Sequence, residues 1–220
     1  TTLFRSVSSA NPFLLRGAKI VFADVEEQYP NLDVSKLEEL ISEKTKAIVP
    51  VHYAGAACDM ERLNALAKEY ELIIIEDAAH ATGANYKGKP LGTLGRFGAL
   101  SFHETKNLTM GEGGLIILND RRDHERAEIS WEKGTNRSAF NRGEVKKYEW
   151  IDIGSSYLPS DIGAALLMNQ LEEFDEIQEK RVQLWKNYFE ELWPLQDKGC
   201  ISLPHIPEYA SINGHLFFME

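Results

Sequence analysis

Short apolar runs along the chain alternate with segments in which apolar residues recur every three or four positions. The most continuous run, residues 72–77, reads LIIIED, and helical patterns flank it on both sides. Such a run is typical of a central strand in a parallel sheet, because both of its faces are covered. We therefore predict an α/β fold with a mostly parallel central sheet and helices on both faces. Strands are predicted over residues 14–25, from residue 46 onward, over 72–77, from residue 97 onward, and over 114–119.

Four segments have the apolar spacing of helices. Asp59 precedes one of them and Ser160 precedes the longest, and both residue types cap helices by accepting a backbone N–H. The longest helix is expected to bend or break near residues 174–176, and Pro194 and Gly199 are expected to end it. The predicted helices cover residues 33–44, 59–70, 121–133 and 161–193.

The remaining segments define the expected domains. Residues 134–156 are rich in Asn, Gly and charge, which indicates a long loop. We expect residues 1–193 to form a partial large domain and residues 194–220 to begin a smaller C-terminal domain. The chain starts without Met and stops at Glu220, inside a further apolar run that we interpret as a strand, so we expect a fragment of a longer protein.

Composition and charge narrow the possible functions. The 220 residues are 43% hydrophobic and 26% charged, as in ordinary soluble globular proteins, and the formal net charge is −10. This charge argues against a general surface for nucleic acid or anionic membrane, both of which need clustered Lys and Arg. Cys58 and Cys200 form no CxxC pair, and no apolar run reaches the ~18 residues of a membrane span. A cytoplasmic protein without a nucleic-acid or membrane partner is expected.

Two strand ends carry the candidate chemistry. Asp77 ends the run at 72–77, and Lys106 follows the apolar strand that begins at Phe97, within the stretch FGALSFHETKNLTMGEGG. Open α/β sheets bind ligands at the carboxyl ends of their strands, so both side chains can converge on one ligand. A strand-end aspartate facing a pyridinium nitrogen and a lysine bonded to an aldehyde are what pyridoxal phosphate requires. We therefore predict a pyridoxal phosphate site at Asp77 and Lys106.

Further polar residues extend this hypothesis. His80 lies three residues beyond Asp77 and could stack on the cofactor ring or bond to it, although a structural histidine is equally compatible. Ser101 precedes Lys106 on the same stretch and suits a phosphate contact. Arg137 and Arg142 lie in the predicted loop, where they could hold an anionic substrate or simply be solvated.

Two functions of other classes remain open from the residues alone. His52, Asp77, His80 and His103 could form the site of a metal-dependent hydrolase, although no pair has the spacing of a helical HExxH motif. The chain could also be a catalytically silent binding protein. Neither GxGxxG nor a Walker motif is present, and GEGG at residues 111–114 is interpreted as a turn.

Three motifs carry a family resemblance: PVHYAGAACDM, EDAAH and SFHETKNLTMGEGG. Together they resemble the DegT/DnrJ/EryC family of sugar aminotransferases, which have fold type I of the pyridoxal-phosphate enzymes. The resemblance implies that Lys106 binds the cofactor covalently, Asp77 contacts its pyridine nitrogen, His80 lies near its ring, and Ser101 contacts its phosphate. Lys106 also argues against the dehydratases of this family, which have histidine there. The family's N-terminal phosphate-binding turn is absent, and the first six residues, TTLFRS, match nothing expected.

The resemblance also implies a reaction and an assembly. It implies transfer of an amino group, from L-glutamate as the donor, to a dTDP-linked 4-keto-6-deoxyhexose, for a bacterial surface polysaccharide such as enterobacterial common antigen. A homodimer is implied for the full-length protein. Many relatives have an asparagine that reaches the partner's phosphate where this chain has Ser156. Arg137 and Arg142 could bind the donor carboxylate or the diphosphate.

Overall fold

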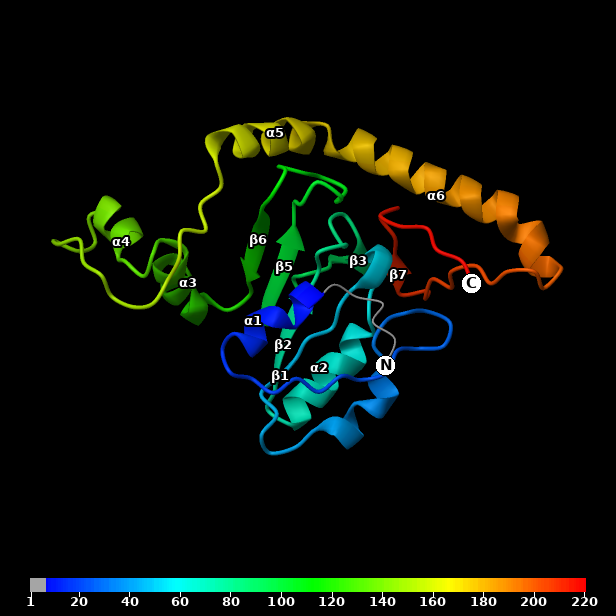
Figure 1. Cartoon of the computed structure of the whole chain (residues 1–220), viewed down its shortest axis with the longest axis horizontal. Helices are drawn as coiled ribbons and strands as arrows, with labels where there is room; N and C mark the ends of the chain where they lie inside the picture. The colour runs from blue at the N-terminus through cyan, green and yellow to red at the C-terminus, as the bar shows by residue number, and fades with distance from the viewer. Residues whose placement is uncertain (1–6) are drawn as a thin grey trace.

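A four-stranded sheet forms the centre of the molecule (Figure 1). The computed structural model describes residues 7–220, so TTLFRS lies outside the described residues. The strands are β1 (Ala47–Ile48), β2 (Ile73–Asp77), β5 (Phe97–Ser101) and β6 (Gly114–Leu118), in the order β1-β2-β5-β6. β1, β2 and β5 are parallel, and β6 is antiparallel to β5. The prediction of a mixed α/β fold with a mostly parallel sheet is confirmed.

The register of β2 and β5 brings their carboxyl ends together. Ile75 pairs with Phe97 and Asp77 pairs with Ala99. On the other side of β2, the backbone N–H of His52 donates to the Asp77 carbonyl at 3.1 Å, which extends the parallel pairing beyond β1. The segments that follow β1, β2 and β5 therefore leave the sheet at the same edge.

Helix α2 (Met60–Glu69) packs against β2, as its apolar spacing predicts. The carboxylate of Asp59 caps it by accepting the Arg62 N–H at 3.2 Å. Leu63 and Ala67 are buried on its inner face. The core around them also contains Ile48, Cys58, Ile74, Ala78, Ala81, Tyr86 and Leu91.

The strand predicted over residues 14–25 is wrong. The chain forms a 3-10 turn at Val7–Ser9 and a short helix α1 at Asn11–Leu14, and then continues through a turn into a segment without regular secondary structure. Val21 and Phe22 are 58% and 60% exposed. An apolar run becomes a strand only where a neighbouring strand takes its backbone hydrogen bonds, and the described residues provide only one isolated bridge here, from Val25 to Leu32.

The helix predicted over residues 33–44 is reduced to two 3-10 turns, Val34–Lys36 and Glu38–Leu40. Asp33 caps the first by accepting the Ser35 N–H at 3.0 Å. The backbone turns extended at Ile41, with φ −78° and ψ 137°, so the pattern buries Val34 and Leu37 without a continuous helix.

The second half of the chain is mainly helical. A 3-10 turn at Arg121–Asp123 leads into α3 (His124–Trp131), and the predicted loop contains a short helix, α4 (Arg137–Asn141). The predicted long helix is two helices, α5 (Asp161–Glu172) and α6 (Phe174–Asp197). Figure 1 shows α5 above β5 and β6, α6 continuing past β3 and β7, and α3 and α4 beyond β6 on the other side.

The predicted ends of the long helix are correct in part. Ser160 caps α5 by accepting the Gly163 N–H at 3.1 Å, and the break falls at Glu173. Pro194 lies inside α6 and does not end it, although proline provides no N–H for the helical ladder. Gly199, with φ +70°, follows the end of the helix, and its N–H donates to the Gln196 carbonyl at 2.8 Å.

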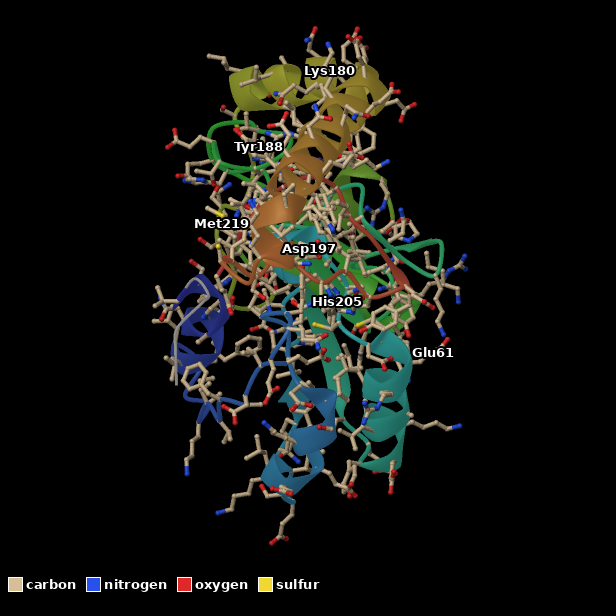
Figure 2. All side chains as sticks on the ribbon, turned by 90° about the vertical axis from the view of Figure 1, so that its right-hand side faces the viewer. Glu61, Lys180, Tyr188, Asp197, His205 and Met219 are labelled. Atoms are coloured by element: carbon tan, nitrogen blue, oxygen red, sulfur yellow. The ribbon has the colours of Figure 1, made fainter. Side chains whose placement is uncertain are left out.

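The C-terminal segment returns to the larger body of the protein (Figures 1 and 2). Its strand β7 (Ala210–Ser211) pairs with β3 (Asn85–Tyr86), which also pairs with β4 (Lys89–Pro90). The strand expected at residues 215–220 is not formed, and Glu220 exchanges backbone hydrogen bonds with Ser202 instead. A domain boundary at residues 193 and 194 stays a prediction. Among the described residues, no helix combines the length and the apolarity that crossing a membrane demands.

A buried carboxylate fixes the connection between β2 and β5. The Glu76 side chain is fully buried and accepts from Nε2 of His52 at 2.9 Å and from the backbone N–H groups of Gly92, Leu94 and Gly95 at 2.6–2.8 Å. Burial alone would raise the pKa of Glu76, but these hydrogen bonds outweigh it and lower the pKa. Glu76 therefore holds the turn that leads into β5.

Replacing Glu76 is expected to destabilise the protein strongly. Glu76→Ala leaves buried donors without an acceptor and should lower the free energy of unfolding by about 3–5 kcal/mol. The lowered pKa means that Glu76 stabilises the fold above its unfolded-state pKa, near 4.5, and that this contribution is lost as the pH falls through its folded-state value. The deficit of Glu76→Gln in urea titrations should therefore shrink on acidification, whereas exposed Glu69→Gln should behave as wild type. An equal deficit at every pH would contradict this role.

Candidate active site

Lys106 lies in the loop that follows β5. The loop is closed by backbone hydrogen bonds at both ends: Phe102 N–H donates to Gly113 O, and Met110 N–H donates to Phe102 O, both at 2.9 Å. Within it, the Lys106 N–H donates to the His103 carbonyl at 2.9 Å. These contacts fix the backbone of Lys106 beside the end of β5, and its side chain is half-buried.

In the structure, the charge of Asp77 acts on the Lys106 amine. Burial lowers the pKa of the Lys106 amine, and the charge of Asp77 opposes this shift only in part. One carboxylate oxygen of Asp77 accepts from the hydroxyl of Ser9 at 2.6 Å, and the other accepts from the Ala79 N–H at 3.1 Å. A less basic amine therefore lies near a carboxylate that is held by two donors.

His80 and Ser101 lie on the segments that lead into and out of this site. Nδ1 of His80 accepts from the Ala54 N–H at 3.3 Å, so the proton of the neutral ring is on Nε2. Its ring contacts those of Tyr53 and His215. Ser101 ends β5 opposite Gly114, and its hydroxyl accepts from the His103 N–H at 3.3 Å.

Sequence reasoning missed Ser9 and His215. Ser9 meets Asp77 across 68 positions of sequence, and His215 meets Asn107 across 108. No local spacing links these partners. The only available signal was the dense group of polar residues in INGHLF, where Asn213 and His215 interrupt an apolar run.

The structure does not bring the other predicted residues into this group. Ser156 is exposed and forms a bridge with Glu132, just beyond α3. Arg142 is ion-paired with Glu128 and Glu144, both at 2.8 Å, and Arg137 lies 3.6 Å from Glu132. α4, which begins at Arg137, lies well away from the carboxyl end of β5 in Figure 1.

The alternative metal site does not assemble in the described part of the chain. His52 is buried against Glu76, and its Nδ1 accepts from the Cys58 N–H at 3.2 Å. His103 lies partly exposed, 3.6 Å from Glu112. No group of three or more His, Cys, Asp or Glu residues with the geometry to hold a metal occurs between residues 7 and 220.

Comparison with known proteins gives the family. The model of the DegT/DnrJ/EryC1/StrS aminotransferase family matches residues 1–219. The chain belongs to this family. The sequence-based prediction of the family is therefore confirmed.

Named relatives include an aminotransferase and a protein of polysaccharide biosynthesis. The chain is 39% identical over 206 residues to a UDP-4-amino-4-deoxy-L-arabinose–oxoglutarate aminotransferase of Shewanella sediminis, covering 92% of this chain and 52% of that protein. It is 37% identical over 184 residues to the spore coat polysaccharide biosynthesis protein SpsC of Bacillus subtilis, covering 82% and 47%. The chain thus spans about half the length of the curated relatives it matches.

A solved structure supports both the fold and the cofactor. A putative sugar aminotransferase of Streptococcus pneumoniae in its PLP form matches with a TM-score of 0.81 and 26% identity, covering 97% of this chain and 57% of that one. Pyridoxal phosphate is the cofactor of the family, as predicted. The residues present here fit it, since a half-buried amine with a lowered pKa lies beside a carboxylate at adjacent strand ends.

Removing the Lys106 charge should stabilise the cofactor-free protein at neutral pH. Because the folded-state pKa of Lys106 is lowered, the unfolded chain binds more protons below pH 10.5, and wild-type stability rises as the pH increases through this window. Lys106→Met should therefore raise the free energy of unfolding at pH 7, with a gain that shrinks towards pH 10.5. Lys87→Met is the control, since Glu61 raises the pKa of Lys87 and no gain is expected. If Lys106→Met lowered the free energy of unfolding by the same amount at every pH, burial of the Lys106 charge would not be costly to the fold.

Removing the Ser9 hydroxyl should weaken cofactor binding. The hydroxyl donates to the charged Asp77, and hydrogen bonds to charged groups contribute about 1.5–3 kcal/mol. Ser9→Ala is expected to raise the Kd for pyridoxal phosphate about 10-fold, measured by absorbance titration of the full-length enzyme. Exposed Ser202→Ala serves as the matched control. An unchanged Kd in Ser9→Ala would show that Ser9 does not hold Asp77 for the cofactor.

Proposed function

We propose that the enzyme containing this chain transfers an amino group from L-glutamate to the 4-keto group of a dTDP-linked 6-deoxyhexose. It would thus be a dTDP-4-amino-4,6-dideoxygalactose transaminase. The observation that supports amino transfer is the half-buried Lys106 amine, with its lowered pKa, beside Asp77. The Shewanella relative acts, by its name, on a nucleotide-linked 4-amino sugar with oxoglutarate, which supports a 4-position and a glutamate donor. SpsC supports a role in surface polysaccharide, such as enterobacterial common antigen.

Each residue of the site has a role in this proposal. Pyridoxal phosphate, when bound, supplies an electron sink for a carbon atom that loses a proton. Asp77 would hold the proton on the ring nitrogen, Lys106 would hold the cofactor through its amine, and Ser101 would contact the phosphate. With the cofactor bound, the Lys106 amine would be placed to take up and return a proton, and its lowered pKa leaves more of it in the neutral form that accepts one. His80 lies beside the ring.

The loop residues act, in this proposal, on the partner's site in a homodimer. α4 lies away from the site of its own chain, and Ser156 is exposed. In the dimer, Ser156 would contact the cofactor phosphate of the partner subunit. Arg137 and Arg142 would bind the carboxylate of the amino donor or the diphosphate of the sugar nucleotide there. The arginines would exchange their glutamate partners for a carboxylate or diphosphate, which offers the same bidentate geometry.

The free thiols Cys58 and Cys200 are consistent with a cytoplasmic location.

Amino transfer is tested with the full-length enzyme, pyridoxal phosphate and L-glutamate. The dTDP-4-keto-6-deoxyhexose should gain an amine, seen by mass spectrometry, with an equal amount of 2-oxoglutarate. Lys106→Arg should lower kcat by about 10³-fold or more, because the covalent anchor and proton carrier are lost, whereas exposed Lys89→Arg should not. Transfer to a UDP-linked 4-keto-pentose alone would replace the proposed sugar by that of the Shewanella relative. Transfer to neither would contradict the proposed function.

The loop proposal has its own test. Arg137→Ala combined with Arg142→Ala should raise the KM for L-glutamate or for the sugar nucleotide, because a charged partner of the substrate is lost. Arg122→Ala is the control, since Arg122 is an exposed arginine that pairs with Asp120. Unchanged KM values for both substrates in the double variant would show that neither arginine binds a substrate.

A further inference from the structure

His215 comes from the C-terminal segment and packs into the Lys106 site. Its Nδ1 lies 2.7 Å from Oδ1 of Asn107, the residue next to Lys106. An amide oxygen can only accept, so Nδ1 of His215 carries the proton and donates. The amide nitrogen of Asn107 donates to the Asn213 carbonyl at 2.8 Å, which fixes the end of the amide that faces His215. The orientation of the imidazole is therefore set by residues on both sides.

Asn213 anchors the same segment to the loop that contains His80. Its side chain is fully buried and donates to the carbonyls of His80 and Thr82 at 2.7 and 2.8 Å. Its Oδ1 accepts from the His215 N–H at 3.1 Å. Gly55 leaves room for this amide, since a Cβ at Gly55, which has φ +82°, would lie 2.0 Å from Asn213 Oδ1. The segment is thus held in place independently of the His215 ring.

The His215 ring lies directly against the His80 ring. Their centroids are 4.4 Å apart, with 39° between the planes, which is close for an aromatic pair. Burial lowers the pKa of His215 to about 3, and the nearby His80, Lys106 and Arg181 add to this shift. His215 is therefore neutral at physiological pH and adds no positive charge beside Lys106.

We propose that His215 is a positioning residue: a neutral imidazole, oriented by Asn107, that holds the ring of His80 in place beside Lys106. The role toward the cofactor rests on the proposed function, whereas the contact with His80 does not. A histidine is suited to this position because its flat ring covers His80 while its Nδ1–H satisfies the buried Asn107 oxygen. Phenylalanine would supply the ring without the donor, and alanine would supply neither.

The contact is tested first in the full-length enzyme without cofactor. Diethylpyrocarbonate modifies accessible imidazoles, and peptide mass spectrometry reports the rate at His80. His215→Ala should raise this rate several-fold, and His215→Phe should raise it less. His205→Ala is the matched control, because exposed His205 lies on the same C-terminal segment (Figure 2) and should leave the His80 rate unchanged. An unchanged rate of His80 modification in folded His215→Ala would overturn the proposal. A wild-type rate in His215→Phe would show that the hydrogen bond to Asn107 is not needed to hold the His215 ring against His80.

The effect on the cofactor is tested by the pH at which the absorbance of bound pyridoxal phosphate changes. His215→Ala should shift this midpoint by roughly half a unit to one unit, the size expected for an aromatic contact. His80→Ala should shift it as well, and the double variant should shift it no further than His80→Ala, because His215 acts through His80. A merely structural His215 would lower the thermal midpoint and leave the absorbance midpoint alone. Additive shifts would overturn the proposal, whereas failure of all variants and wild type to bind cofactor would contradict the proposed function instead.

Discussion

The site depends on one buried carboxylate. Glu76 accepts four hydrogen bonds, from the His52 ring and from three N–H groups of the turn that enters β5. Leaving any of these donors without an acceptor would be costly in a buried environment, so the turn and β2 keep one relative position. This position sets β2 and β5 in register. Asp77, the next residue, has its side chain on the opposite face of the strand, and its charge acts on the Lys106 amine.

The chemistry follows from how differently the two neighbouring carboxylates are surrounded. Glu76 is fully enclosed and structural, whereas Asp77 is half-buried and held by Ser9 and the Ala79 N–H. The amine opposite Asp77 has a lowered pKa because burial outweighs the attraction of the carboxylate. A lysine of this kind is a better nucleophile at neutral pH than a solvated one, which is what covalent attachment of an aldehyde cofactor requires.

Much of this arrangement could be predicted from the sequence. The continuous apolar run that ends in Asp77 and the apolar run that leads to Lys106 both form strands of the sheet, and Asp59 and Ser160 mark helix starts by residue type alone. The run at residues 14–25 shows where local pattern fails, because its apolar residues need a strand beside them. Likewise, Pro194 was predicted to end a helix that in fact continues through it.

The residues that sequence reasoning missed share one physical cause. Ser9 and His215 reach the site only through tertiary contacts, across 68 and 108 positions of sequence. Asn213 is the clearest case, since its buried side-chain amide donates to the carbonyls of His80 and Thr82, and its backbone carbonyl accepts from the side chain of Asn107. From the sequence alone, such residues cannot be distinguished from ordinary polar loop residues, because their partners are brought near only by the fold. The C-terminal segment thus adds side chains next to the loop that contains Lys106.

The pairing of Lys106 with Asp77 around pyridoxal phosphate is tested most directly by covalent trapping. The full-length enzyme is mixed with the cofactor, its absorbance is recorded, and borohydride is added before proteolysis and mass spectrometry of the peptides. We expect a visible absorbance band that borohydride removes, with the reduced cofactor on the peptide that contains Lys106, and we expect Asp77→Asn to weaken the band. Absence of the band in wild type, or attachment of the cofactor to a different lysine, would contradict the assignment of Lys106.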